Sequence, residues 1–310
     1  MKTIQTIHSS KSHLGWDNSL SPAIVVEPAT TLEIDLNDSS GGQLSRDSDP
    51  ADLASLDFSR VNPLTGPISI DGAEPGDAIQ ITMLGFERKV DWGWTAIIPG
   101  FGLLADAFGD PAICISKYNS SGSIDFMGIA EIPFRPFAGT IGVALAESGT
   151  HSVVPPRNVG GNLDVRDLVE GSVLRLPVAV PGALLSIGDG HAAQGDGEVC
   201  GTAIETTLGI SVTLGLIKGA NLSAPRFETG PLNRQMDRDG YFVATGVGPD
   251  LLQCAKDAVS SMIDEIAART SISPQDAYML CSVAGDLRIS EIVDAPNWVV
   301  SCYMPKGIFE

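Results

Sequence analysis

Positive charge is scarce in this sequence. Its 310 residues include 19 Lys and Arg against 38 Asp and Glu, which gives a formal net charge of −19 at pH 7. A surface of this sign repels phosphate backbones and anionic lipid, so we expect neither nucleic acid nor a membrane as a partner. It is compatible with neutral or cationic small molecules and with metal ions.

Long hydrophobic runs and paired cysteines are also missing. No apolar run approaches the ~20 residues that span a bilayer, and the N-terminal segment lacks the apolar core of a secretory signal peptide. The five cysteines are widely spaced and include no Cys-x-x-Cys pair, which argues against a disulfide framework and a cysteine-ligated zinc site. We therefore expect a cytoplasmic protein.

Glycine and proline, in contrast, are abundant and spread along the chain. The 34 Gly and 20 Pro indicate many short strands joined by tight turns. Four turn sequences each precede an alternating or apolar run of strand length, at residues 31–36, 78–83, 172–178 and 183–188. We predict a mainly β fold, with a β-sandwich (jelly-roll-like) front over residues 1–215 and only a short helix near 50–56.

The C-terminal part, residues 216–310, predicts a smaller α+β region. Apolar residues recur at helical spacing between Pro249 and Arg269, which indicates an amphipathic helix over about 249–269. Residues 273–276 read Ser-Pro-Gln-Asp, a helix N-cap followed by proline in the first turn, and predict a second helix to about residue 283. Strands are expected over 287–292 and 298–304.

Residues 188–198 contain the densest group of chemically active side chains. Asp189, His191, Gln194, Asp196 and Glu198 lie within this segment, interleaved with four glycines. Glycine permits close backbone approach and positive φ, so the loop can turn these side chains toward one point. Carboxylate and imidazole are ligands of zinc and other first-row metals. The alternative is an ordinary Asp/Gly turn in an acidic protein.

Two segments nearer the N-terminus offer further candidates. His13 precedes Trp16 in a polar and aromatic cluster, and it is the best second histidine among the four in the chain. Asp38 and Gln43 lie in a polar loop after a predicted strand, where an ordinary turn is the simpler interpretation. Cys200, directly after the acidic loop, has the chemistry of a nucleophile, but its apolar neighbours favour a small buried residue.

These segments resemble the acetamidase/formamidase family. The string Gly-Asp-Gly-His-Ala-Ala-Gln-Gly-Asp-Gly-Glu over 188–198 is long and specific, and the similarity continues in order from about residue 8 to Lys306. Asp164 and Glu205 are also family motif positions. The other matching segments are residues 16–19, 41–43, 66–68, 72–77 and 160–164.

The resemblance implies a metal-dependent hydrolysis of a small neutral amide, such as formamide or acetamide, to a carboxylate and ammonia. It also implies a β-sandwich front with an α+β back. From the chemistry of the family positions we assign the metal ligands as Asp189 and His191, with His13 and Asp38 as candidates for the rest. The ion is expected to be zinc, with calcium and magnesium as the alternatives because the loop is rich in carboxylates.

The remaining family positions receive catalytic and substrate-binding roles. Glu198 is expected to be the general base, with a metal-ligand role as the alternative. Asp196 is a second catalytic candidate. The expected substrate-binding residues are Gln43, Gln194 and Trp16.

Two other function classes remain open from the sequence. The same site could act on another C–N bond, such as that of a lactam or an amino-acid amide, because function depends on the site and not on the fold. A non-catalytic binding protein is the second alternative, although such a protein would not need both His191 and Glu198. The apolar strands and scarce lysine also favour a homo-oligomer.

Overall fold

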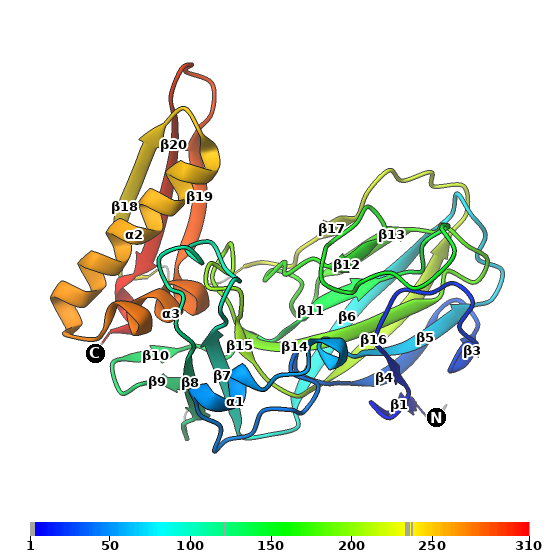
Figure 1. The fold of residues 1–310 in the computed structure, drawn as a ribbon. Coiled ribbons are helices and arrows are strands. Elements are labelled where there is room, and N and C mark those ends of the chain that lie inside the picture. The colour runs from blue at the N-terminus through cyan, green and yellow to red at the C-terminus, as the bar shows by residue number, and fades with distance from the viewer. Residues whose placement is uncertain (1–3, 121, 233–235, 237, 310) are drawn as a thin grey trace.

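Two β-sheets packed face to face form the larger part of the molecule. The computed structural model describes residues 4–120, 122–232, 236 and 238–309, and Figure 1 shows strands over most of the chain. The first sheet has six strands in the order β1-β4-β16-β6-β13-β17. Their bounds are Gln5–Ile7 (β1), Thr30–Leu36 (β4), Leu208–Ile217 (β16), Ala78–Arg88 (β6), Val173–Pro177 (β13) and Arg226–Glu228 (β17).

The second sheet has eleven strands and carries the site described below. Its main path runs β10-β9-β8-β7-β15-β14-β11-β12, and β5 pairs with β14, β2 and β3. The bounds are Ala130–Ile132 (β10), Ile124–Phe126 (β9), Ala112–Tyr118 (β8), Trp92–Ile97 (β7), Ile204–Glu205 (β15), Leu185–Ala193 (β14), Phe137–Gly142 (β11), Gly160–Asn162 (β12), Leu64–Ile70 (β5), Ser12–His13 (β2) and Ile24–Val26 (β3).

Alternating side chains build the core between the two sheets. In β4 the inward residues Leu32, Ile34 and Leu36 are buried, whereas Glu33 is exposed. They pack with apolar residues of β6, β13 and β16 from their own sheet and of β5, β11 and β14 from the other. The alternation is the period-2 pattern of a strand with one buried face, so the predicted mainly β sandwich is confirmed.

A three-stranded antiparallel sheet and two helices form the back of the molecule. The sheet order is β18-β20-β19, and Figure 1 shows α2 lying along it. The helices pack with β8, β9 and the end of β14 in a second apolar core. The bounds are Tyr241–Gly248 (β18), Leu251–Thr270 (α2), Pro274–Ala284 (α3), Asp286–Glu291 (β19) and Trp298–Pro305 (β20).

Both predicted C-terminal helices are present. Ser273 is the predicted cap of α3, whereas α2 begins at Leu251, two residues after Pro249, with Asp250 as its cap. Asp250 accepts a hydrogen bond from Gln253 N at the start of α2, and Ser273 accepts one from Asp276 N at the start of α3. These bonds satisfy amide groups that have no partner inside the helix. The short helix near residue 50 is also present, as α1 (Pro50–Ala54), with Asp49 as its cap. Two 3-10 turns, η1 (Phe58–Arg60) and η3 (Lys306–Ile308), are also present.

The division at residue 215 stays a prediction. The six-stranded sheet continues beyond it, because β16 ends at Ile217 and β17 pairs with β13. None of the described helices is long and apolar enough to cross a bilayer.

Candidate metal-binding active site

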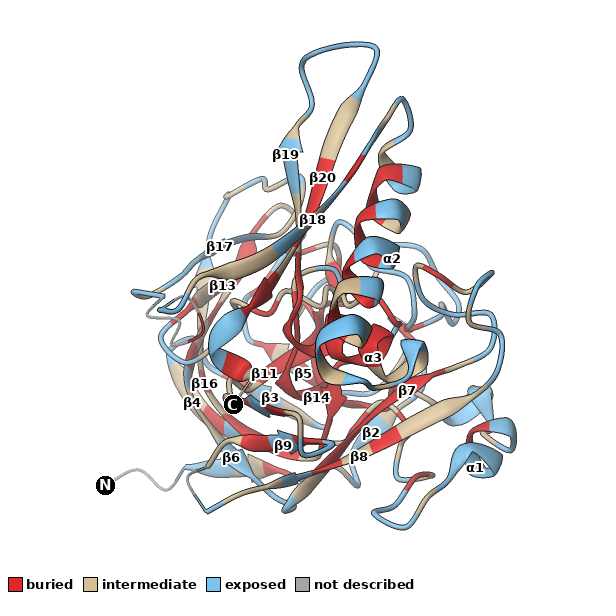
Figure 2. Cartoon of the chain, turned by 90° about the vertical axis from the view of Figure 1, so that its left-hand side faces the viewer, coloured by how far each residue is buried: buried red, intermediate tan, exposed pale blue. Residues whose placement is uncertain are grey.

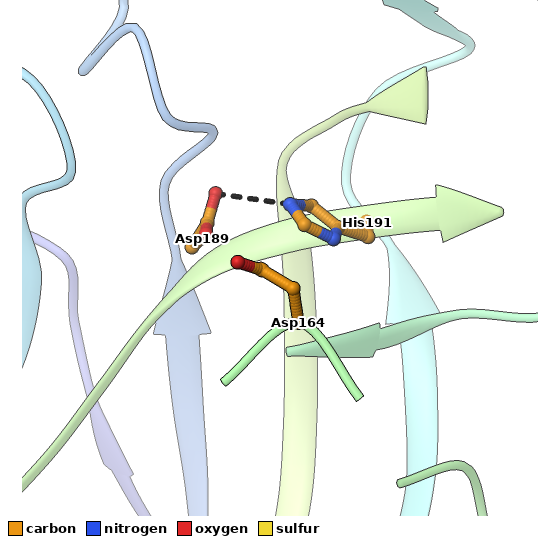
Figure 3. A group of neighbouring side chains, drawn as sticks. All are labelled: Asp164, Asp189 and His191. Atoms are coloured by element: carbon orange, nitrogen blue, oxygen red, sulfur yellow. Dashed lines mark hydrogen bonds and ion pairs between the residues drawn. The ribbon is translucent and has the colours of Figure 1, made fainter. Parts of the chain in front are cut away.

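Strand β14 runs through the middle of the molecule and carries the first two site residues. It is buried along its whole length, and Figure 2 shows it in red among other buried strands. Asp189 and His191 are two residues apart on this strand, and His191 Nε2 lies 3.1 Å from Asp189 Oδ1 (Figure 3). The His191 ring also meets the edge of Phe137 on the paired strand β11, with ring centroids 4.9 Å apart.

Glu205 reaches the same point from the neighbouring strand. The register of β14 and β15 places Glu205 directly opposite His191, and its Oε1 lies 3.3 Å from His191 Nε2. Ser39 Oγ donates to Glu205 Oε2 at 2.8 Å, and Ala203 N donates to Oε1 at 3.0 Å. These two donors hold the carboxylate in place beside the imidazole.

Asp164 and Glu198 approach the cluster from loops. Asp164 follows β12, and its carboxylate accepts a hydrogen bond from Asn162 Nδ2 at 2.8 Å. The backbone φ angles of Asp164, Asp189 and Glu198 are 49°, 64° and 44°. Left-handed conformations cost energy for residues other than glycine, and they gather at functional sites where the surrounding structure enforces them. Three such residues in one cluster therefore support a functional role.

The electrostatics of the cluster follow from burying several charges together. Burial and the negative charge of Asp189 raise the pKa of Asp164 to about 8, and burial with the nearby Asp164 raises the pKa of Glu198 well above its usual range. Burial also raises the pKa of Glu205. Burial alone would lower the pKa of His191, but the carboxylates of Glu205 and Asp189 outweigh it and raise that pKa well above 6.5.

A divalent cation fits this arrangement. The ligand atoms of Asp164, Asp189 and His191 lie within 4.8 Å of one another, and so do those of His191, Glu198 and Glu205. Asp164 Oδ1 and His191 Nδ1 are buried without a hydrogen-bond partner in the described chain. One imidazole faces four carboxyl groups, of which Asp189 and Glu205 are buried and Asp164 and Glu198 partly buried, and uncompensated buried charge is costly. The donor set of carboxylates and an imidazole is one that zinc accepts.

A cavity of about 120 Å³ connects the cluster with the surface. Asp189, Glu198 and Glu205 line it together with Thr202 and apolar side chains. A small molecule that enters this cavity meets the carboxyl groups directly.

The other two predicted ligands are His13 and Asp38. Neither residue belongs to the two groups of atoms that could hold an ion. His13 Nε2 lies 2.8 Å from Ser186 Oγ, and its Nδ1 lies 2.7 Å from Gly15 O, so both ring nitrogens are occupied. Asp38 is buried, and Ser40 Oγ donates to its Oδ1 at 2.5 Å. Burial raises the pKa of Asp38.

The predicted substrate-binding residues contact other parts of the chain, and their role toward a substrate stays a prediction. The Gln43 amide bonds Ser40 O and both backbone polar groups of Asp57, which ties two loops together. Gln194 Nε2 donates to Asp164 O at 2.9 Å, while its Oε1 is buried without a partner among the described residues. Trp16 is buried against Leu64 and Val153.

Asp196 belongs to neither group of atoms that could hold an ion and is not among the residues that line the cavity. Its Oδ1 lies 3.2 Å from Nε of the buried Arg166, which also forms an ion pair with Asp286 of β19. Arg166 Nη1 donates to Gln194 O at 3.2 Å. The geometry gives Asp196 a part in anchoring the acidic loop to the C-terminal sheet.

Helix α3 forms hydrogen bonds with residues 199–202, which follow the acidic segment. Ser282 Oγ donates to Thr202 O at 2.7 Å and accepts from Cys200 N at 3.1 Å. One turn earlier, Tyr278 donates to Val199 O and accepts from Leu104 N. Residues spaced i, i+4 on one helix face therefore fix the segment that follows Glu198.

Comparison with known proteins agrees with the resemblance seen in the sequence. The profile of the acetamidase/formamidase family matches residues 2–152 and 144–310. The chain belongs to this family. A formamidase of Methylophilus methylotrophus is 27% identical over 100% of this chain and 94% of its own length. An acetamidase of Mycolicibacterium smegmatis is 31% identical over 67% of this chain and 66% of its own length.

Solved structures share the fold of this family member. An acetamidase from Bacillus halodurans superposes with a TM-score of 0.69 at 29% identity and covers 96% of both chains. A gamma lactamase from Delftia acidovorans superposes with a TM-score of 0.91 at 24% identity, covering 99% of this chain and 93% of its own. The mainly β fold is thus shared along nearly the whole chain.

Asp164 and Glu205 are the cluster members to which sequence reasoning gave no role. Both are family motif positions, and this was the only feature of the sequence that pointed to a functional role for them. Neither lies within the 188–198 segment, and no local pattern shows that β12 and β15 end beside His191. Gly139 was missed as well, although a Cβ there would lie 2.6 Å from both Asp164 Oδ1 and Asp189 Oδ2.

Proposed function

We propose that this protein is a metal-dependent amidase that hydrolyses a small linear amide to a carboxylate and ammonia. The observation that carries the proposal is the cluster of four carboxyl groups around His191, three of which line a cavity. Membership of the acetamidase/formamidase family supports the reaction class.

The ion would be held by Asp189 and His191, as the sequence predicts, together with Asp164 and Glu205. The latter two replace His13 and Asp38 in the proposal, because the atoms of Asp164 and Glu205 lie beside His191. A bound divalent ion supplies a Lewis acid, which polarises an amide carbonyl and lowers the pKa of water toward ~7. The central imidazole favours zinc over calcium or magnesium, which prefer oxygen ligands.

Glu198 is the proposed general base. It lines the cavity beside Thr202 and Glu205, within reach of a small substrate. Burial raises its pKa, and a carboxylate of raised pKa is a better proton acceptor. In this role Glu198 takes a proton from water and passes it to the departing ammonia, while Asn162 and Thr140 hold the carboxylates of Asp164 and Asp189.

The test combines metal analysis with ammonia release from formamide and acetamide, with and without a chelator. The proposal expects about one ion per chain and chelator-sensitive release of ammonia. Metal without turnover of any linear amide would contradict the proposal, and turnover of a γ-lactam alone would place the chemistry on cyclic amides instead.

Two variants separate the roles inside the cluster. His191→Ala should lose metal and activity together, and retention of both would remove His191 from the ligand set. Glu198→Gln should retain metal and lose kcat by at least about 100-fold, the typical contribution of a general base. Loss of metal in Glu198→Gln would make Glu198 a ligand.

The cytoplasmic location, the homo-oligomeric state and the identity of the ion as zinc remain predictions. Size-exclusion chromatography with light scattering measures the oligomeric state directly. The same purified protein serves for metal analysis, so the oligomeric state and the identity of the ion are checked on one sample.

A further inference from the structure

The cavity above the cluster has two chemically different ends. Its inner end presents the carboxyl groups of Asp189, Glu198 and Glu205. The remaining described lining residues carry no formal charge, and the outer wall is apolar. That wall is formed by Leu56, Phe58, Val61, Ile98, Phe101 and Val154.

Two stacked aromatic rings lie on the outer wall. The rings of Phe58 and Phe101 are 5.5 Å apart between centroids with 3° between their planes, yet Phe58 is 49% exposed and Phe101 is 42% exposed. Adjacent exposed apolar side chains at a concave site are typical of ligand-binding grooves. The unpaired faces and edges of these rings can cover an apolar group that projects from the cavity.

Braced loops carry both rings. Phe58 begins η1, whose cap Asp57 accepts from Ser59 N at 3.0 Å and is tied to Gln43. Phe101 lies beside Gly102, where a Cβ would come within 2.7 Å of Cys200 O. The loop of Phe101 is therefore packed against the segment that follows Glu198. Both rings are preformed rather than recruited by the ligand.

The cavity is larger than the smallest amides require. An empty apolar cavity of about 150 Å³ binds benzene, which has six heavy atoms. By that scale the 120 Å³ here holds about five heavy atoms, before any group that projects toward Phe58 and Phe101 is counted. Formamide has no acyl carbon side chain and acetamide has one methyl group, so both leave the apolar wall in contact with water.

We infer that the substrate is a primary amide with an uncharged apolar acyl side chain of about three to six carbons, alkyl or phenyl. The amide lies at the carboxyl groups and the side chain lies along the apolar wall, between Val154 and the Phe58–Phe101 pair. This inference rests on the proposed amidase function and specifies its substrate class. A charged acyl group, such as that of an amino-acid amide, would have no counter-charge on this wall.

The first experiment is a substrate series on the unmodified enzyme: formamide, acetamide, propionamide, butyramide, hexanamide and benzamide. Each methylene buried against the wall should raise kcat/KM by roughly fourfold, the equivalent of about 0.8 kcal/mol, until the cavity is filled. The gain should appear mainly in KM, since the side chain is remote from the reacting bond. Constant or falling kcat/KM beyond acetamide would overturn the inference but leave the amidase function intact. Absence of ammonia from every amide would instead refute the proposed function.

Variants of the ring pair provide the second experiment. Phe58→Ala and Phe101→Ala should each lower the ratio of kcat/KM for hexanamide to that for acetamide by about tenfold. Phe227→Ala is the matched control, because Phe227 is similarly exposed at 43% on β17 but lies outside the cavity lining. An unchanged ratio in both ring variants would exclude the pair from substrate binding.

Discussion

His191 and Glu205 face each other across the β14–β15 strand pair, with the imidazole Nε2 3.3 Å from the carboxylate Oε1. The pairing joins a residue of the 188–198 segment, whose residues up to Ala193 lie in strand β14 and not in the predicted loop, to a residue outside that segment. Both side chains are buried, at 1% and 2% exposure. A substitution at Glu205 should therefore alter the metal-binding site while the sequence of residues 188–198 stays unchanged.

Glu205→Gln should weaken metal binding. The substitution keeps the shape of the side chain but removes one negatively charged ligand from the cluster. Loss of even an outer partner of a ligand lowers metal affinity by about 10- to 100-fold, so loss of this ligating carboxylate should lower it at least as much. Competition with a chelator of known affinity measures the change. Glu228→Gln on β17 is the control, because its 67% exposed carboxylate pairs with Arg175 on the six-stranded sheet. Equal affinity in the two variants would refute a role for Glu205.

Gly139→Ala should disrupt the cluster while leaving the fold in place. A Cβ at this position would lie 2.6 Å from the carboxylate oxygens of Asp164 and Asp189 and 2.7 Å from His191 Cε1. Such overlap forces the side chains apart and costs about 1–3 kcal/mol. Metal content and ammonia release should both fall by at least about tenfold.

The matched control for Gly139 is Gly109→Ala. An added Cβ at Gly109 meets no atom within 4 Å, so metal content and activity should equal those of the unmodified protein. Circular dichroism of both variants checks that the sheets remain folded. Full activity in Gly139→Ala would show that the added methyl group does not disturb the side chains of the cluster, and it would contradict the prediction.

All five cysteines should resist alkylation in the native protein. Each is a buried free thiol, and burial raises the pKa of Cys200 to about 11 and that of Cys114 to about 12. Because the thiolate is the reactive form, iodoacetamide at pH 8 should label none of them before denaturation and five after it. Mass spectrometry counts the labels.

Cys200→Ala should retain most of the activity. Cys200 Sγ contacts Ala96 O and Thr202 Oγ1 and does not itself line the cavity, which agrees with its interpretation as a small buried residue. Loss of all ammonia release with metal content unchanged would instead make the thiol a nucleophile.

Acid should weaken the protein through Asp77. Its carboxylate accepts from Lys218 Nζ at 2.6 Å, Gly219 N at 2.9 Å and Glu74 N at 2.8 Å, and the Lys218 bond in particular lowers the pKa of Asp77 to about 2. The folded pKa lies below the unfolded value of about 3.9. Stability from this group is therefore fully present above about pH 4 and is lost as the pH falls through 2.

Urea unfolding between pH 5 and pH 2 tests the contribution of Asp77. In Asp77→Asn the free energy of unfolding should be lower at pH 5, and its decline toward pH 2 should be shallower than in the unmodified protein. Asp71→Asn, in the exposed turn after β5, is the control and should follow the unmodified curve. Parallel curves for all three proteins would exclude Asp77 from the acid response.

The sequence by itself determined the features that depend on short-range spacing. Alternation of Leu32, Ile34 and Leu36 specifies a strand with one buried face, and the capping residue Ser273 specifies where α3 begins. Period and capping are encoded within a few consecutive residues, because they arise from local backbone geometry and local hydrogen bonds. The two-residue spacing that places Asp189 and His191 on one face of a strand is likewise encoded in consecutive residues.

Only the tertiary structure decided which distant residues join Asp189 and His191. Glu205 meets the imidazole because β15 pairs with β14 in one register, and a shift of one residue would turn its side chain to the opposite face. His13 lies instead against Ser186, three residues before Asp189 on the same strand. Strand register depends on the packing of the whole sheet, so no local pattern in the sequence contains it.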